Sequence, residues 1–352
     1  MPRVRKRSGS VAAQLLTLTV LVAACGSAGD QLLDTTPPDI VRGAAAYTGL
    51  AVDADVQVTF SEAVESSTVN SLTFTLVRAG LLTPVPATVT YQTSARQATL
   101  DPSNDLEPTA VYRAKVTSGV TDADGNPMPG DREWWILTAG GPPVRSGPIQ
   151  REATTTVINP MPTGTVTVAA PEGTTSGDVL VACLSLNTRR VAPDGIPADW
   201  LPFATVTPIP NPHVLGYFKV AGDSEPDYYT WTLTAPAENS GGIARYSGVD
   251  TASPLDAVVT EGSGVATRAG TIPSVTTSTA GAMIVSCMGA NSSTDAVNFA
   301  SPAGLVEAWD LGGKRHELAD GVQAVAGPSG TKTWTFRARR EWAGWLTALR
   351  PS

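Results

Sequence analysis

The residues in this chain that are best suited to chemistry are three cysteines and two histidines. Cys183 and Cys287 both fall in apolar segments. In an oxidising compartment they can form a disulfide, and otherwise they can stay as two buried thiols that pack like small hydrophobic residues. Both alternatives remain open from the sequence. A zinc site needs three or four ligands, which His213, His316 and two buried cysteines do not supply. We therefore predict no metal site and no cofactor.

The histidines also give no indication of hydrolytic catalysis. A Ser-His-Asp arrangement needs a serine on a sharp turn, and the sequence has no Gly-x-Ser-x-Gly motif. We expect His213 in an exposed loop after Pro212, and His316 on a strand with one solvated face. Paired carboxylates can hydrolyse glycosides, but 32 acidic residues nominate no particular pair. We predict a protein that is not an enzyme.

Tryptophans offer a route to ligand binding, because exposed indoles can stack on sugar rings. Of the eight tryptophans, Trp231 and Trp334 recur at matching positions of an internal repeat, which favours a core role for both. Trp200, Trp309 and Trp342 have no matching tryptophan. These three are our candidates for stacking against a ligand at the surface.

One loop has the spacing of a calcium site. Asp122, Asp124, Asn126 and Glu133 occupy positions 1, 3, 5 and 12 of a loop of the EF-hand kind, where oxygen ligands can surround the ion. However, Pro127 stands where such a loop needs a flexible glycine, and no helices are predicted beside it. The alternative is a polar turn in which side chains bind their own backbone. We favour the turn and keep the four residues as weak calcium candidates.

The first 25 residues have the layout of an export signal. Four basic residues among the first seven precede a mostly apolar run from 11 to 24, which is too short to span a bilayer. Its end, Val22-Ala23-Ala24-Cys25, resembles the lipobox of bacterial lipoproteins. The resemblance implies that residues 1–24 are removed and that lipidated Cys25 holds the chain on a membrane surface. Gly26 implies the outer membrane if the organism is diderm. The alternative is an ordinary secretory signal with a chance cysteine.

Charge and composition limit the partners of the rest of the chain. The first 24 residues hold four of the 24 basic residues and none of the 32 acidic ones, so the remaining chain is strongly acidic. Nucleic-acid binding needs a basic surface, and we predict none. Residues 25–38 are mostly small and polar and end in two prolines, which favours an extended tether.

Residues 39–139 read as a β-sandwich. Apolar and polar residues alternate, as in Val56-Gln57-Val58-Thr59-Phe60, and several such segments are separated by turns. The order of Phe60-Ser61-Glu62, Tyr112-Arg113-Ala114, 122–126 and Trp135-Ile136-Leu137-Thr138 resembles the SbsA-type bacterial Ig-like domain, which occurs in S-layer and other cell-surface proteins. The resemblance implies a spacer or adhesion module without catalytic residues.

Residues 150–352 contain an internal duplication after a linker at 140–149. The segment 177–183 is echoed by 281–287, at an offset of 104, and Trp231-Thr232-Leu233 by Trp334-Thr335-Phe336, at an offset of 103. Two copies of one strand pattern predict an all-β, jelly-roll-like fold. We favour one pseudo-two-fold β-sandwich over two tandem ones, because each copy is too small to cover both faces alone. The region also resembles a β-rich domain of secreted bacterial proteins with no assigned activity.

Together these patterns predict a lipid-anchored, surface-exposed, non-catalytic binding or adhesion protein. Its expected partners are the membrane, through the anchor, and a cell-surface polysaccharide or envelope protein. One alternative is a structural spacer or coat component of the cell envelope. The other is a glycan-acting hydrolase whose site the sequence does not reveal.

Overall fold

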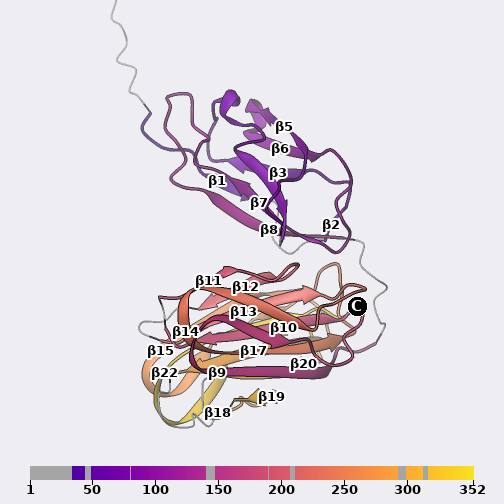
Figure 1. The fold of residues 1–352 in the computed structure, drawn as a ribbon, viewed down its shortest axis with the longest axis vertical. Helices are drawn as coiled ribbons and strands as arrows, with labels where there is room; N and C mark the ends of the chain where they lie inside the picture. The colour runs from indigo at the N-terminus through magenta and orange to yellow at the C-terminus, as the bar shows by residue number, and fades with distance from the viewer. Residues whose placement is uncertain are drawn as a thin grey trace, which may run out of the picture. The chain divides into compact units, whose positions relative to one another are not determined.

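The computed structural model describes most of the chain, namely residues 34–43, 49–79, 81–139, 147–188, 190–206, 211–291, 299–311 and 316–352. The predicted signal peptide and Cys25 lie outside these residues. Every named element is a strand apart from two short 3-10 turns, η1 (Ser66–Thr68) and η2 (Thr93–Ala95). The predicted all-β fold class is therefore confirmed (Figure 1). In the described part of the chain, no helix has the length and apolar character needed to cross a membrane.

Two four-stranded sheets form the N-terminal sandwich. One has the order β1-β3-β6-β5, with β1 (Ile40–Gly43), β3 (Val56–Phe60), β6 (Gln97–Pro102) and β5 (Ala87–Gln92). The other has the order β2-β8-β7-β4, with β2 (Gly49–Leu50), β8 (Arg132–Thr138), β7 (Val111–Val116) and β4 (Phe74–Arg78). Alternate residues such as Val58, Phe74 and Ala114 fill the core between the sheets, because side chains of a strand point to opposite faces in turn.

Each copy of the repeat forms one further sheet of six strands. The first has the order β11-β14-β10-β13-β12 with β9 paired to β14; its strands are β9 (Gln150–Ala169), β10 (Val179–Leu186), β11 (Pro193–Gly195), β12 (Leu201–Val206), β13 (His213–Val220) and β14 (Tyr228–Ser247). The second has the order β15-β22-β17-β20-β19 with β18 paired to β22; its strands are β15 (Leu255–Ile272), β17 (Ala282–Ala290), β18 (Phe299–Ala300), β19 (Val306–Asp310), β20 (His316–Gln323) and β22 (Lys332–Leu349). A small pair joins β16 (Thr276–Thr277) to β21 (Gly327–Pro328).

The two sheets pack face to face around one shared core, with β10 and β17 in adjacent layers (Figure 1). The rings of Phe203, from the first sheet, and Trp345, from the second, meet edge to face with centroids 4.9 Å apart. Residues from both copies therefore build a single sandwich, because neither sheet buries this face alone.

The central strand β10 is buried on both faces along its whole length. Val181 belongs to the core between the two sheets, whereas Leu184 belongs to a second core on the outer face of the first sheet. That second core forms because β14 and β9 are each 20 residues long and change pairing register between Thr232 and Asn239. Beyond this break, Trp231 packs over the outer face of β10 with other residues of the same core.

Candidate functional site

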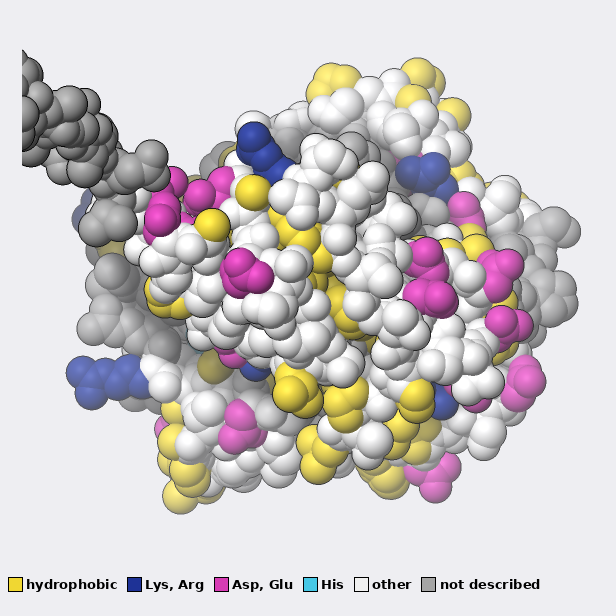
Figure 2. Space-filling model, turned by 90° about the horizontal axis from the view of Figure 1, so that it is seen from above, with side chains coloured by type: hydrophobic (Ala, Val, Ile, Leu, Met, Phe, Trp, Pro, Cys, Tyr) yellow, Lys and Arg dark blue, Asp and Glu magenta, His cyan; other side chains and the backbone are white. Residues whose placement is uncertain are grey.

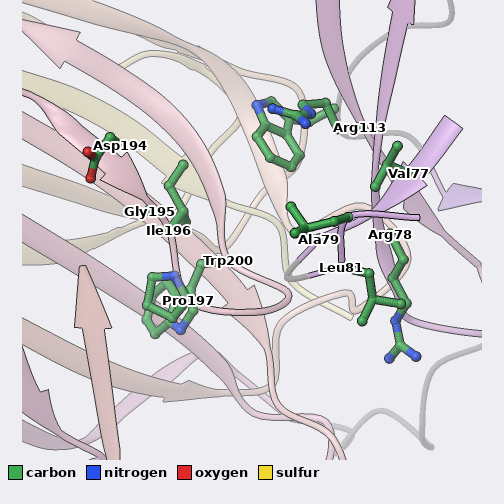
Figure 3. Close-up of a pocket in the computed structure, with 12 residues that line it drawn as sticks. Val77, Arg78, Ala79, Leu81, Arg113, Asp194, Gly195, Ile196, Pro197 and Trp200 are labelled. Atoms are coloured by element: carbon green, nitrogen blue, oxygen red, sulfur yellow. The ribbon is translucent and has the colours of Figure 1, made fainter. Parts of the chain in front are cut away.

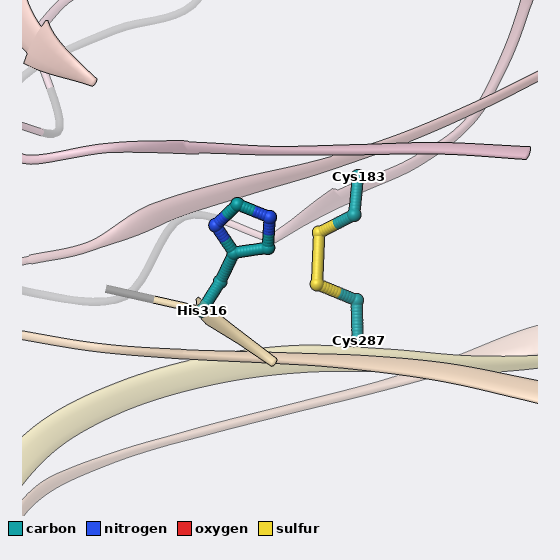
Figure 4. Close-up of side chains that lie close together, drawn as sticks. All are labelled: Cys183, Cys287 and His316. Atoms are coloured by element: carbon teal, nitrogen blue, oxygen red, sulfur yellow. A yellow bond between two sulfur atoms is a disulfide. The ribbon is translucent and has the colours of Figure 1, made fainter. Parts of the chain in front are cut away.

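A disulfide between Cys183 and Cys287 lies at the centre of the sandwich (Figure 4). Cys183 is on β10 and Cys287 on β17, their Cα atoms are 6.4 Å apart, and both side chains are fully buried. The two residues hold equivalent positions in the two copies. The pairing thus connects the central strand of one sheet to the central strand of the other.

His316 lies beside this disulfide and is fully buried, contrary to the expected position on a half-solvated strand (Figure 4). Its Nδ1 is 2.9 Å from Ser240 Oγ, and its ring meets the Trp309 indole edge to face with centroids 5.9 Å apart. Burial lowers the pKa of His316 to about 3, so the imidazole is neutral at physiological pH. The two sulfurs and the imidazole are close enough to share a metal ion, but sulfurs bonded to each other are not thiolate ligands.

His213 is also buried, on β13, rather than exposed in a loop. Its Nδ1 is 3.0 Å from the carbonyl oxygen of Val191, and burial lowers its pKa. This contact gives one of the two ring nitrogens a hydrogen-bond partner, so we assign His213 a structural role in the core.

The three candidate stacking tryptophans are not on the surface, so this prediction was wrong. Trp200 is 0% exposed, and Trp309 and Trp342 are each 6% exposed. Trp200 packs edge-on against Tyr229 and Trp231, with ring centroids 5.1 and 5.2 Å apart. The other two fill the shared core and the outer core of the second sheet. None of the three indoles has a face free to stack on a sugar.

A pocket lies elsewhere in the structure, with a mainly apolar lining (Figure 3). Its wall includes Val77, Ala79, Leu81, Ile196 and Pro197. Its lining contains one carboxylate, Asp194, with two arginines, and neither histidine nor cysteine. Glycoside hydrolysis requires two acids that flank the bond to be broken, and the lining of this pocket does not provide such a pair.

A buried lysine of the first sheet, Lys219, lies between two carboxylate side chains. Lys219 Nζ lies 3.4 Å from Glu225 Oε1 and 3.6 Å from Asp199 Oδ2, and the side chains of Lys219 and Glu225 are each 8% exposed. Glu225 accepts hydrogen bonds from the Gly222 backbone N–H and the Tyr229 hydroxyl, both at 2.6 Å. We did not predict this cluster, because Lys219 sits in an apolar run where only its charge marks it.

Comparison with known proteins identifies one part of the chain. Residues 34–137 match the model of the bacterial Ig-like domain, Big_5. The match covers less than a third of the chain. No curated protein matches this chain.

Similar solved structures include the bacterial S-layer protein SbsC, domains 1–6, at 14% identity and a TM-score of 0.25, over 87% of this chain and 53% of that one. The N-terminal part of SbsC matches at 13% identity and a TM-score of 0.25, over 56% of this chain and 44% of that one. Alpha-2-macroglobulin from Escherichia coli, domains MG0-NIE-MG1, matches at 11% identity and a TM-score of 0.24, over 85% of this chain and 96% of that one. The chain spans about half the length of the S-layer structures it matches.

Within the bacterial Ig-like domain, the calcium candidates form a polar turn. Asp122 Oδ1 accepts the backbone N–H groups of Asp124 and Asn126 at 3.0 and 2.8 Å, and its Oδ2 accepts the Asn126 side-chain amide at 2.7 Å. Glu133, on β8, pairs with Lys115 at 3.4 Å instead of turning toward the loop. The oxygens of Asp122 that would bind calcium are therefore used by the turn itself.

Proposed function

We propose that this protein is a non-catalytic structural component of the cell envelope, exported and held on a membrane surface through lipidated Cys25. The export layout of residues 1–25, the bacterial Ig-like domain at 34–137 and the buried disulfide support this proposal. Disulfides persist in oxidising compartments outside the cytoplasm. In a diderm bacterium, the anchor would be in the outer membrane.

An open sheet edge favours the structural role over ligand binding. Strand β5 lies at the end of its sheet and pairs only with β6 among the described residues, so its other edge presents backbone groups that a neighbouring envelope protein can pair with. The binding hypothesis depended on exposed indoles at Trp200, Trp309 and Trp342, which are buried. We therefore place the spacer or coat role first and polysaccharide adhesion second.

Surface charge is consistent with a role that does not involve nucleic acid. Figure 2 shows a face on which acidic side chains are scattered among neutral ones and lysines and arginines are few. A phosphate backbone would be repelled by such a surface, because binding relies on lysine and arginine contacts. The expected partners are the membrane and other envelope proteins.

Cell fractionation with Cys25→Ala tests the anchor directly. We expect the wild-type chain in the membrane fraction and the variant in the soluble extracytoplasmic fraction. Equal membrane retention of both would contradict the proposed anchor. The soluble variant can then be screened against cell-wall polysaccharides, and saturable binding would move the adhesion role ahead of the structural one.

A further inference from the structure

The amine of Lys219 lies between two carboxyl groups, those of Asp199 and Glu225. The side chains of Lys219 and Glu225 are each 8% exposed, and that of Asp199 is 20% exposed. Asp199 Oδ1 is buried and accepts no hydrogen bond from the described residues, and Arg78 Nε lies 3.9 Å from it. Water therefore has little access to the Lys219 amine and only partial access to Asp199.

The duplicated copy shows what the fold alone requires at two of these positions. Lys219 pairs with Leu180 of β10, and Gly321 pairs with Ile284 at the equivalent position of β17. Gly321 is therefore the counterpart of Lys219 in the second copy. Asp199 has a φ of 62°, and its counterpart Gly304 has a φ of 83°. A side chain at Gly321 would collide with the Gly304 carbonyl oxygen, so strand and turn touch in the second copy. The first copy carries a lysine and an aspartate at this contact, although a left-handed backbone favours glycine.

We propose that Lys219 Nζ and Asp199 Cγ form an intramolecular isopeptide bond, with Glu225 as the group that transfers protons. The Nζ–Cγ bond forms as the bond between Cγ and one carboxyl oxygen breaks, and that oxygen leaves as water. Nζ loses two protons, which Glu225 passes in turn to the departing oxygen. One ammonium and one carboxylate thus give one amide and one water, with no oxidant or other reactant.

Glu225 is held in position for this transfer. The Gly222 N–H and the Tyr229 hydroxyl each donate to one of its carboxylate oxygens, while Oε1 faces Lys219 Nζ at 3.4 Å. Burial, and then the adjacent Glu225 carboxylate, raise the pKa of Tyr229 far above its ordinary value, so its hydroxyl remains a donor. A carboxyl group fixed within reach of the reacting nitrogen is suited to general acid–base catalysis.

Lys115 provides a matched control. Its Nζ is 2.7 Å from Asp131 and 3.4 Å from Glu133, so it also lies between two carboxylates. Its side chain is 32% exposed, and those of its two partners are 41% and 38% exposed. Solvated ion pairs of this kind stay ionic, so no bond should form at Lys115.

Peptide mapping of the purified full chain tests the bond. Trypsin cuts after Arg190, Lys219 and Arg245, and 219 is the one basic residue between the other two. We expect wild-type protein to give an uncut peptide of residues 191–245 that is lighter than its sequence by one water. Lys219→Arg and Asp199→Ala should give peptides of full mass, whereas Lys115→Arg should keep the uncut, lighter peptide. Glu225→Gln should lower the rate of bond formation by about 100-fold or more.

A wild-type digest that contains residues 191–219 and 220–245 at full mass would overturn the proposal, whatever the stability of the variants. So would an uncut, lighter peptide that persists in Asp199→Ala, since that would assign the bond to another carboxyl group. Circular dichroism melting of each variant identifies any loss of signal that comes from misfolding.

Discussion

Cys183 and Cys287 occupy equivalent positions in two copies of one strand pattern and are bonded to each other across the centre of the sandwich. A residue and its own repeat can meet in this way only near a pseudo-two-fold relation between the two sheets. The bond closes a loop of about the length of one copy, since 104 residues separate the cysteines. The disulfide therefore connects the two copies as well as the two sheets.

The loop length predicts the effect of removing this bond. The Cys183→Ser, Cys287→Ser double variant should lose about 4 kcal/mol of unfolding free energy, because a closed loop of this size restricts the unfolded chain. Urea denaturation with and without reductant measures the loss. Reductant should destabilise the wild type alone. Equal sensitivity of both proteins would show that the bond does not form in solution.

Close packing of Trp309 on Gly242 predicts a second effect. A side-chain carbon at Gly242 would collide with the Trp309 indole, and a ring in a filled core cannot move aside cheaply. Gly242→Ala should therefore lower stability by about 1 to 3 kcal/mol. Gly164, also on a long strand, has open space at the same position, so Gly164→Ala should change stability by less than about 0.5 kcal/mol. Equal effects in thermal melts would contradict the packing described.

Several elements of the fold could be predicted from local pattern. Alternation at Val56, Val58 and Phe60 identified β3 and its buried face, because one side of that strand is more exposed than the other. The echo of 177–183 in 281–287 identified two equivalent strands, now β10 and β17. In both cases the information lies within a few consecutive residues or in direct repetition.

The repeat correctly predicted that Trp231 and Trp334 are core residues, but the burial of the three unmatched tryptophans and the lysine cluster could not be predicted in this way. The outer core of the first sheet depends on a break in the register of β14, and such a break leaves no periodic signal. Trp200 is buried by the same outer core, so its lack of a repeat partner gave the wrong indication. Lys219 meets Asp199 and Glu225 through turns that tertiary packing positions.

The Asp122 turn gives a prediction that separates a structural turn from a calcium site. Asp122 is buried and accepts three hydrogen bonds, and bonding to Asn126 is the main reason that its pKa is lowered. Asp122→Ala should lower the free energy of unfolding by about 1 to 3 kcal/mol. The loss should be the same in the presence of calcium and in the presence of a chelator. Asp124→Ala, at an exposed position, should have a small effect. A melting temperature of the wild type that rises with calcium would instead support an ion in the loop.

Two adjacent buried groups predict opposite responses of stability to pH. Burial raises the pKa of Glu317 to about 7 from 4.5, and burial lowers that of His316 to about 3 from 6.5. The folded state binds more protons at Glu317 than the unfolded state, so this contribution is present below pH 4.5 and is lost as pH rises to about 7. The His316 contribution is present above pH 6.5 and is lost as pH falls toward 3.

Glu317→Gln should therefore remove the loss that occurs between pH 4.5 and 7. The free energy of unfolding of the variant, relative to that of the wild type, should rise by about 3 kcal/mol between pH 4.5 and pH 7.5. His316→Gln should shift the difference in the opposite direction, because it removes a contribution that grows with pH. Urea denaturation at intervals across this range measures both differences. A Glu317→Gln difference that is constant with pH would mean that the pKa of Glu317 is the same in the folded and unfolded states, and that the effect of burial is offset by donors such as the Ser301 hydroxyl.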